Sequence, residues 1–92
     1  MKFDWNPEKN KWLRENRDVS FEEITCLINE GHLIGILRHP RKEKQKVLKV
    51  LIVERDGYAY NIPFIEEEDG LCFLKTIYPS RASTKKYLKR MA

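Results

Sequence analysis

One apolar run near the middle of the chain most constrains the fold. Val47–Val53 is β-branched or apolar except at Lys49, and such a run is typical of a strand covered on both sides. Asp56-Gly57 follows shortly after, and Asp-Gly between apolar runs favours a type I′ turn because both central positions take positive φ. The sequence therefore predicts a central antiparallel hairpin in which Arg55 pairs with Tyr58.

This register assigns the side chains of the hairpin to two faces of a sheet. One face carries Lys49, Leu51, Val53, Tyr60, Ile62 and Phe64, and the other carries Leu48, Val50, Ile52, Asn61, Pro63 and Ile65. Because proline has no N–H group to donate, we expect either a bulge at Pro63 or an interruption of the second strand before Phe64. Residues 66–70 predict an acidic loop, and residues 71–78 predict the next strand of an antiparallel meander.

The N-terminus predicts a short strand followed by a helix. Lys2–Trp5 alternates as a strand does. Asn6 is suited to cap a helix that runs from Pro7 to about Asn16, because its side chain accepts a bond from a free N–H group and proline has none to leave unpaired. Few residues of this helix are apolar, so we expect it to lie across the surface, anchored by Trp12 and Leu13.

A second helix has stronger signals at both ends. Ser20 and Glu23 form a capping box, and Gly31 is suited to the left-handed position that ends a helix. Residues 33–37 predict a short strand, and the basic residues 38–44 predict a mobile loop.

The last element is a helix with one basic side. Ser80 or Ser83 is expected to cap it after Pro79. The apolar side would hold Thr84, Tyr87, Leu88 and Met91, and the opposite side Arg81, Lys85 and Lys89, with Lys86 and Arg90 beside them.

The 92 residues have room for one domain, residues 1–92, with a simple core. We expect an α+β fold in the order β-α-α-β-β-β-β-α, with a small antiparallel sheet and helices on one face. Cys26 and Cys72 are expected to be buried free thiols, and no clustered Cys or His indicates a metal or another cofactor. Without a transmembrane run or a signal-peptide core, the sequence predicts a soluble cytoplasmic protein that does not enter a membrane.

Two basic segments stand out from an otherwise acidic chain with a net charge of +4. Residues 81–92 contain five Lys and Arg residues and no acid, and residues 38–46 contain five with Glu43. Such segregation is typical of a surface that binds a polyanion. We expect the two segments to converge on a common side of the sheet. The nucleic-acid-binding candidates are Lys85, Lys86, Lys89, Arg90, Arg41, Lys42 and Lys49.

Two stretches together resemble a known family. Phe3-Asp4-Trp5-Asn6-Pro7-Glu8-Lys9-Asn10, followed by Val19-Ser20-Phe21-Glu22-Glu23, resembles the opening of the BrnT family of bacterial toxins, and the strand and basic helix from Ile77 to Tyr87 resemble its close. The resemblance implies a RelE-like fold and a ribonuclease that cleaves mRNA and halts translation. It also implies neutralisation by a cognate ribbon-helix-helix antitoxin in a hetero-oligomeric complex.

Cleavage of RNA by its own 2′-hydroxyl group needs a base, an acid and cations that stabilise the phosphorane. Arg81 suits the last role because a guanidinium at a strand-to-helix junction can hold two phosphate oxygens. The alternative is a solvated arginine or one that pairs with the antitoxin. Lys75 and Arg17 are further candidates. His39 could act as acid or base, and Tyr78 could stack on a base or donate a proton.

These observations predict a type II toxin that is a metal-independent endoribonuclease. The alternative is a module that binds nucleic acid, or docks the acidic antitoxin, without cutting RNA. The two differ at Arg81, because a binding arginine affects affinity and a catalytic arginine affects cleavage.

Overall fold

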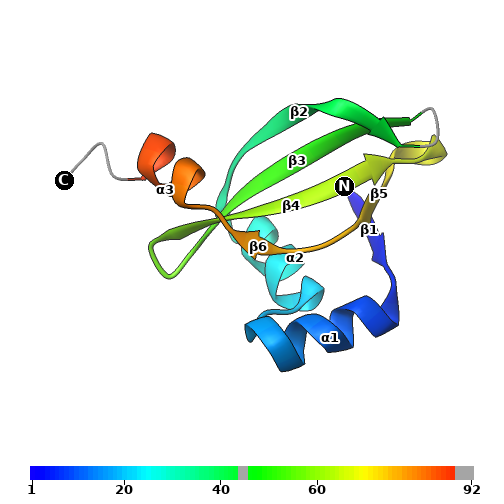
Figure 1. The fold of residues 1–92 in the computed structure, drawn as a ribbon. Coiled ribbons are helices and arrows are strands. Elements are labelled where there is room, and N and C mark those ends of the chain that lie inside the picture. Colours follow the sequence, from blue (N-terminus) through cyan, green and yellow to red (C-terminus); the bar gives the residue numbers. More distant parts are fainter. Residues whose placement is uncertain (44–45, 89–92) are drawn as a thin grey trace.

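The computed structural model describes residues 1–43 and 46–88, with the side chains of residues 40–43 excepted. The described residues form an α+β fold with a mixed sheet of six strands and three α-helices (Figure 1). In chain order the elements are β1 (Lys2–Trp5), α1 (Pro7–Arg17), α2 (Phe21–Asn29), β2 (Leu33–Glu43), β3 (Lys46–Arg55), β4 (Tyr58–Glu66), the 3-10 turn η1 (Glu68–Gly70), β5 (Leu71–Leu74), β6 (Tyr78–Pro79) and α3 (Arg81–Tyr87). None of the helices in these ranges is long and apolar enough to span a membrane.

The hairpin of β3 and β4 forms as predicted. Arg55 pairs with Tyr58, and the register continues to the pair of Leu48 with Ile65. Asp56 and Gly57 have φ values of 54° and 79°, as a type I′ turn requires. The two predicted faces of the hairpin are therefore confirmed.

Pro63 affects hydrogen bonding along the edge of β4 that faces away from β3. In an antiparallel strand the N–H and C=O of one residue point the same way, and the Pro63 carbonyl accepts from the Lys75 N–H at 2.8 Å. The ladder with β3 therefore continues through the pair of Val50 with Pro63, and the missing N–H weakens the opposite ladder. The single strand expected over residues 71–78 is split there into β5 and β6, so the expected interruption of β4 itself is wrong.

The sheet is mixed rather than purely antiparallel, because β1 pairs parallel to β5. Its order is β1-β5-β4-β3-β2, with β6 beside the start of β4. Consecutive strands from β2 to β5 pair antiparallel, which confirms the meander.

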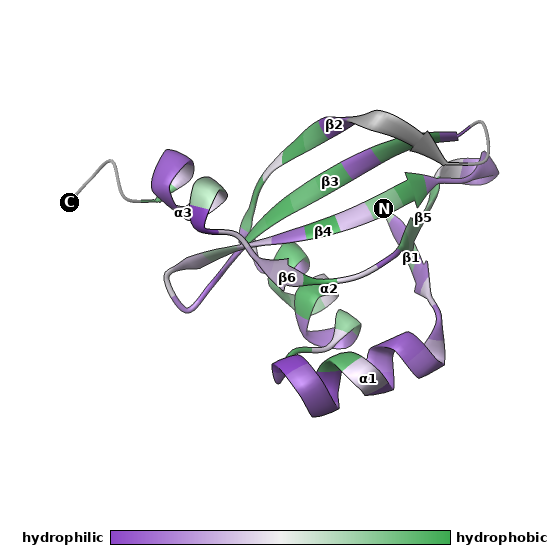
Figure 2. Ribbon diagram, in the orientation of Figure 1, coloured by the Kyte–Doolittle hydropathy of each residue, from purple (hydrophilic) through white to green (hydrophobic). Residues whose placement is uncertain are grey.

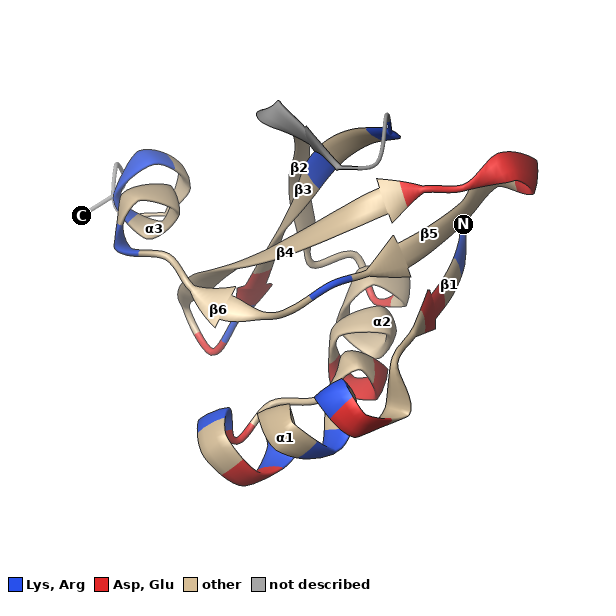
Figure 3. Cartoon of the chain, turned by 45° about the vertical axis from the view of Figure 1, so that its right-hand side comes forward, with Lys and Arg blue, Asp and Glu red and all other residues tan. Residues whose placement is uncertain are grey.

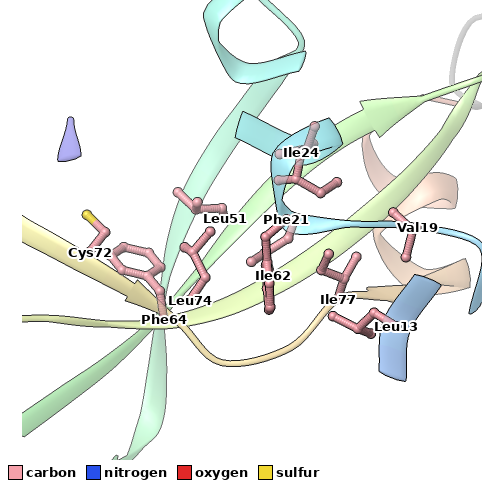
Figure 4. Close-up of a cluster of buried hydrophobic side chains, with 11 residues drawn as sticks. Leu13, Val19, Phe21, Ile24, Leu51, Ile62, Phe64, Cys72, Leu74 and Ile77 are labelled. Atoms are coloured by element: carbon pink, nitrogen blue, oxygen red, sulfur yellow. The ribbon is translucent and has the colours of Figure 1, made fainter. Parts of the chain in front are cut away.

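Helices cover both faces of the sheet, so the expectation of helices on one face is wrong. On one face, α1 and α2 bury Leu13, Phe21 and Ile24 against residues of β3, β4 and β5 (Figure 4). On the other face, Tyr87 and Leu88 at the end of α3 pack against Val50, Ile52 and Ala59. Figure 2 shows that β3 is hydrophobic along most of its length, with one hydrophilic interruption. Because alternate side chains of a strand face opposite ways, such a strand needs cover on both faces of the sheet.

The helix caps follow the sequence closely. The Asn6 side chain accepts from the Glu8 and Lys9 N–H groups at 2.8 and 3.2 Å, and the Ser20 hydroxyl accepts from the Glu23 N–H at 3.1 Å. Gly31, with φ of 95°, ends α2 as predicted.

The basic stretch predicted as a mobile loop is instead part of β2 as far as Glu43. The ladder with β3 reaches the pair of Glu43 with Lys46, with a register shift between Arg38 and Lys42. β2 is the last strand of the sheet, where charged residues and bulges are common because they discourage unwanted pairing.

The two cysteines differ in burial. Cys72 is buried, and desolvation raises the pKa of its thiol. Cys26 is exposed on α2, so the prediction of two buried thiols holds for Cys72 alone.

Candidate nucleic-acid interface

Helix α1 is fixed to α2 by a buried asparagine. The Asn10 amide donates to the Glu22 carboxylate at 2.7 Å, and its oxygen accepts from the Phe21 N–H at 2.8 Å. Asn10 and Leu13 together form the buried side of α1. Trp12, which we expected to share the anchoring with Leu13, is 40% exposed instead.

Trp12 is in contact with two cations. The Lys9 ammonium lies 4.4 Å from the centroid of its ring, and the Arg17 guanidinium carbon lies 5.0 Å away. The exposed side of α1 therefore presents an aromatic ring between positive charges.

Arg17 also joins α1 to the segment between β5 and β6. Its Nη1 donates to the carbonyl of Ile77 at 2.6 Å. Parallel strand β1 pairs with residues 71–74, and Arg17 binds a carbonyl of the segment that follows them. This contact gives Arg17 a structural role at the position where catalysis was predicted.

An open hollow of about 570 Å³ lies between α1 and β5. The lining residues come from the start of α1 and from the end of β5: Asn6, Glu8, Lys9, Phe73, Leu74 and Lys75. The Lys75 ammonium is 5.8 Å from the centroid of the Phe73 ring. The hollow is thus lined by the pair of Phe73 and Lys75 on the β5 side and by Lys9 on the α1 side.

The segment that begins at Lys75 leads from this hollow to α3. At about 3.3 Å per extended residue, Lys75 to Pro79 spans about 13 Å. Tyr78 is 37% exposed on this path, and Arg81 is exposed at the first residue of α3. Four of the five predicted catalytic residues therefore lie along one edge of the molecule: Arg17, Lys75, Tyr78 and Arg81. We call this edge, with Lys9 and Trp12 included, the cationic edge.

Helix α3 is held in place by buried hydroxyl groups. The Ser80 hydroxyl caps it by accepting from the Ser83 N–H at 3.0 Å, and the Ser83 hydroxyl donates to Asn61 at 2.9 Å. Thr84 and the apolar residues at its end face the sheet, while Lys85 and Lys86 are exposed. The predicted division of this helix into a packed and a basic side is confirmed for its described residues.

The other predicted residues lie elsewhere or outside the described part. His39 belongs to β2, at the edge of the sheet opposite β5. Lys49 faces away from α3 and forms an ion pair with Glu66 at 2.9 Å. The side chains of Arg41 and Lys42, and the residues Lys89, Arg90 and Met91, lie outside the described residues.

The expected convergence of the two basic segments is therefore wrong. Figure 1 shows that α3 lies at one end of the molecule. The end of β2, at Glu43, and the start of β3, at Lys46, lie at the opposite end. Acidic residues lie near that opposite end, where Lys46 pairs with Glu67 as Lys49 pairs with Glu66 (Figure 3). Blue segments also mark α1, α3 and the stretch between β5 and β6 in Figure 3. The candidate surface is therefore the cationic edge, and not a common surface formed by residues 38–46 and 81–92.

Apart from Arg17, sequence reasoning missed the residues that α1 contributes to this site. Glu8, Lys9 and Trp12 were assigned to a surface helix without a function, and Phe73 to a strand. The spacing of Lys9 and Trp12 is the available signal, because residues three apart are neighbours on a helix.

Comparison with protein-family models, curated proteins and solved structures gives no match for this chain. The resemblance to BrnT toxins therefore stays a prediction, and so does the RelE-like arrangement.

Proposed function

We propose that this protein is a metal-independent endoribonuclease toxin that binds mRNA along the cationic edge and cuts it at the hollow between α1 and β5. The observation that carries the proposal is the composition of that hollow, whose lining residues include one acidic residue, Glu8, and two basic residues, Lys9 and Lys75. When a 2′-hydroxyl group attacks the phosphorus, the reaction needs a base and cations, and a carboxylate and two lysines can supply them.

Each of these three residues has a part in the proposed reaction. Glu8 accepts the proton of the 2′-hydroxyl as its oxygen forms a bond to phosphorus. Lys9 and Lys75 stabilise the negative charge of the phosphorane, and Lys75 donates a proton to the 5′-oxygen as its bond to phosphorus breaks. The products are a 2′,3′-cyclic phosphate and a 5′-hydroxyl end.

Residues further along the edge hold the rest of the strand. Tyr78 offers a ring to an unpaired base, and Arg81 offers a guanidinium to a phosphate about two nucleotides from the hollow. Lys85 and Lys86 add positive charge beyond it. His39 has no part in this arrangement, since it lies at the opposite edge of the sheet.

The cognate ribbon-helix-helix antitoxin is the proposed partner in the cytoplasm. Support comes from β2, whose outer edge carries Ile36 and Leu37 with exposed fractions of 47% and 41%. An unpaired edge strand with exposed apolar side chains is a surface on which a partner strand can add. The exposed Arg38 beside them favours an acidic partner.

End-labelled single-stranded RNA incubated with the purified protein in EDTA tests the proposal. We expect cleavage to cyclic phosphate ends, and no cleavage when the antitoxin encoded beside the toxin is added first. Lys75→Ala should reduce the cleavage rate by about 100-fold or more with a small effect on binding. Arg81→Ala should mainly weaken binding and lower its salt slope by about one.

The matched control is His39→Ala, which should cleave as the wild type does. RNA that stays intact with the folded wild-type protein would reject the nuclease. If the same protein still binds RNA, the alternative of a non-catalytic binding module is correct.

A further inference from the structure

Trp12 is an aromatic side chain whose position the core does not explain. Leu13 and Asn10 bury the inner side of α1, while Trp12 stays 40% exposed. Its ring is in contact with two cations, Lys9 and Arg17. An exposed tryptophan between two positive charges is unlike an apolar anchor. It combines two features by which proteins recognise single-stranded nucleic acids, a stacking surface and neighbouring groups that bind phosphate.

Lys9 places this ring beside the hollow. Its ammonium lies over Trp12, and the same residue lines the hollow with Phe73 and Lys75. A nucleotide with its phosphate between Lys9 and Lys75 would therefore have an aromatic ring available on the side of α1.

The two cations at Trp12 differ in how firmly they are held. Arg17 is fixed by its 2.6 Å bond to the Ile77 carbonyl. Lys9 carries a single flexible ammonium at the rim of the hollow, so it can leave the ring for a phosphate when a base arrives.

We propose that Trp12 is the stacking platform for an unpaired base of single-stranded RNA, with Lys9 moving from the Trp12 ring to the adjacent phosphate. This inference rests on the proposed function for the choice of RNA as ligand. It goes beyond that function by naming the residue that selects unpaired over paired nucleotides. In a duplex the bases are already stacked on one another and cannot reach the ring.

Fluorescence titration with a 2′-O-methyl oligoadenylate of about eight nucleotides tests this platform. The 2′-O-methyl groups prevent cleavage, so binding is measured separately from catalysis. We expect the oligonucleotide to quench the emission of Trp12, identified as the part of the signal that is absent in Trp12→Phe. Trp12→Ala should weaken binding about 10-fold, and Trp12→Phe by less, because a smaller ring still stacks.

Glu15→Ala is the matched control, since Glu15 is exposed on the same helix and carries no positive charge. It should bind at least as tightly as the wild type. A duplex of the same sequence should bind with equal affinity to the wild type and to Trp12→Ala. Circular dichroism of each variant shows that α1 is intact.

The inference is overturned if Trp12→Ala binds the oligonucleotide as tightly as the wild type, or if binding leaves the Trp12 emission unchanged. Its failure is distinguishable from failure of the nuclease. A protein that shows Trp12 quenching and cuts no RNA rejects the nuclease alone, whereas a protein that cuts RNA with no effect at Trp12 rejects the platform alone.

Discussion

Thr84 shows how a single hydroxyl group positions the basic helix α3. Its hydroxyl group accepts a hydrogen bond from the Ala59 N–H and donates one to the Ser80 carbonyl, both at 2.8 Å, and the residue is 1% exposed. The sequence placed Thr84 on the packed side of the helix. The partner of the hydroxyl could not be predicted, because Ala59 lies in a distant strand whose position relative to α3 depends on the whole sheet.

Thr84→Val tests this contact at the residue scale. Valine has a similar shape but leaves the buried Ala59 N–H without an acceptor, so the free energy of unfolding should fall by about 2 kcal/mol. Urea denaturation measures it. Thr25→Val is the matched control, since the Thr25 hydroxyl lies in an exposed contact on α2, and it should change the free energy by less than about 0.5 kcal/mol. Equal losses in both variants would contradict the assigned role of Thr84.

At the scale of elements, local signals predicted the starts of α1 and α2, the end of α2 and the central hairpin. Asp-Gly turns and capping residues act through neighbours in the sequence, so their geometry is readable without the fold. The extension of β2 was missed because its backbone is satisfied by pairing with β3, which overrides the loop tendency of a charged stretch. The break between β5 and β6 was not predicted, because the effect of Pro63 was assigned to its own strand and not to the strand along its other edge.

The turn of the β3–β4 hairpin is joined to the start of β2 by Glu54. Its carboxylate accepts from the Gly57 N–H at 2.6 Å and contacts the His32 ring at 2.6 Å. The hydrogen bond from Gly57, and to a smaller extent the contact with His32, lower the pKa of Glu54 below its ordinary value. A carboxyl group with a lowered pKa in the folded state stabilises the protein above its unfolded pKa, and this contribution is lost as the pH falls through the folded value.

Glu54→Gln should therefore lower the free energy of unfolding near neutral pH. It should also reduce the further loss of stability that the wild type shows from about pH 5 to about pH 3. Urea denaturation at several pH values measures both effects. Glu15→Gln, at an exposed position on α1, should keep the pH dependence of the wild type. A Glu54→Gln protein with the wild-type dependence would show that the hairpin contact contributes nothing.

At the scale of the whole molecule, the basic residues at the two ends differ in their surroundings. Glu66 and Glu67 pair with Lys49 and Lys46 at one end, so those lysines are not available as an isolated positive surface. The sequence identified Lys75, Tyr78 and Arg81 as candidates from the chemistry of their side chains and, for Arg81, from its place at a strand-to-helix junction. It could not predict which basic segments share a side of the molecule, since that depends on strand order and on which face each helix covers.

The position of bound RNA tests the central claim most directly. An NMR titration of the protein with an uncleavable 2′-O-methyl oligonucleotide reports which backbone amides change their chemical shift. We predict that the largest changes fall in α1 from Lys9 to Arg17 and in the segment from Phe73 to Arg81. Changes concentrated in β2 and the start of β3, with none along the cationic edge, would contradict the account.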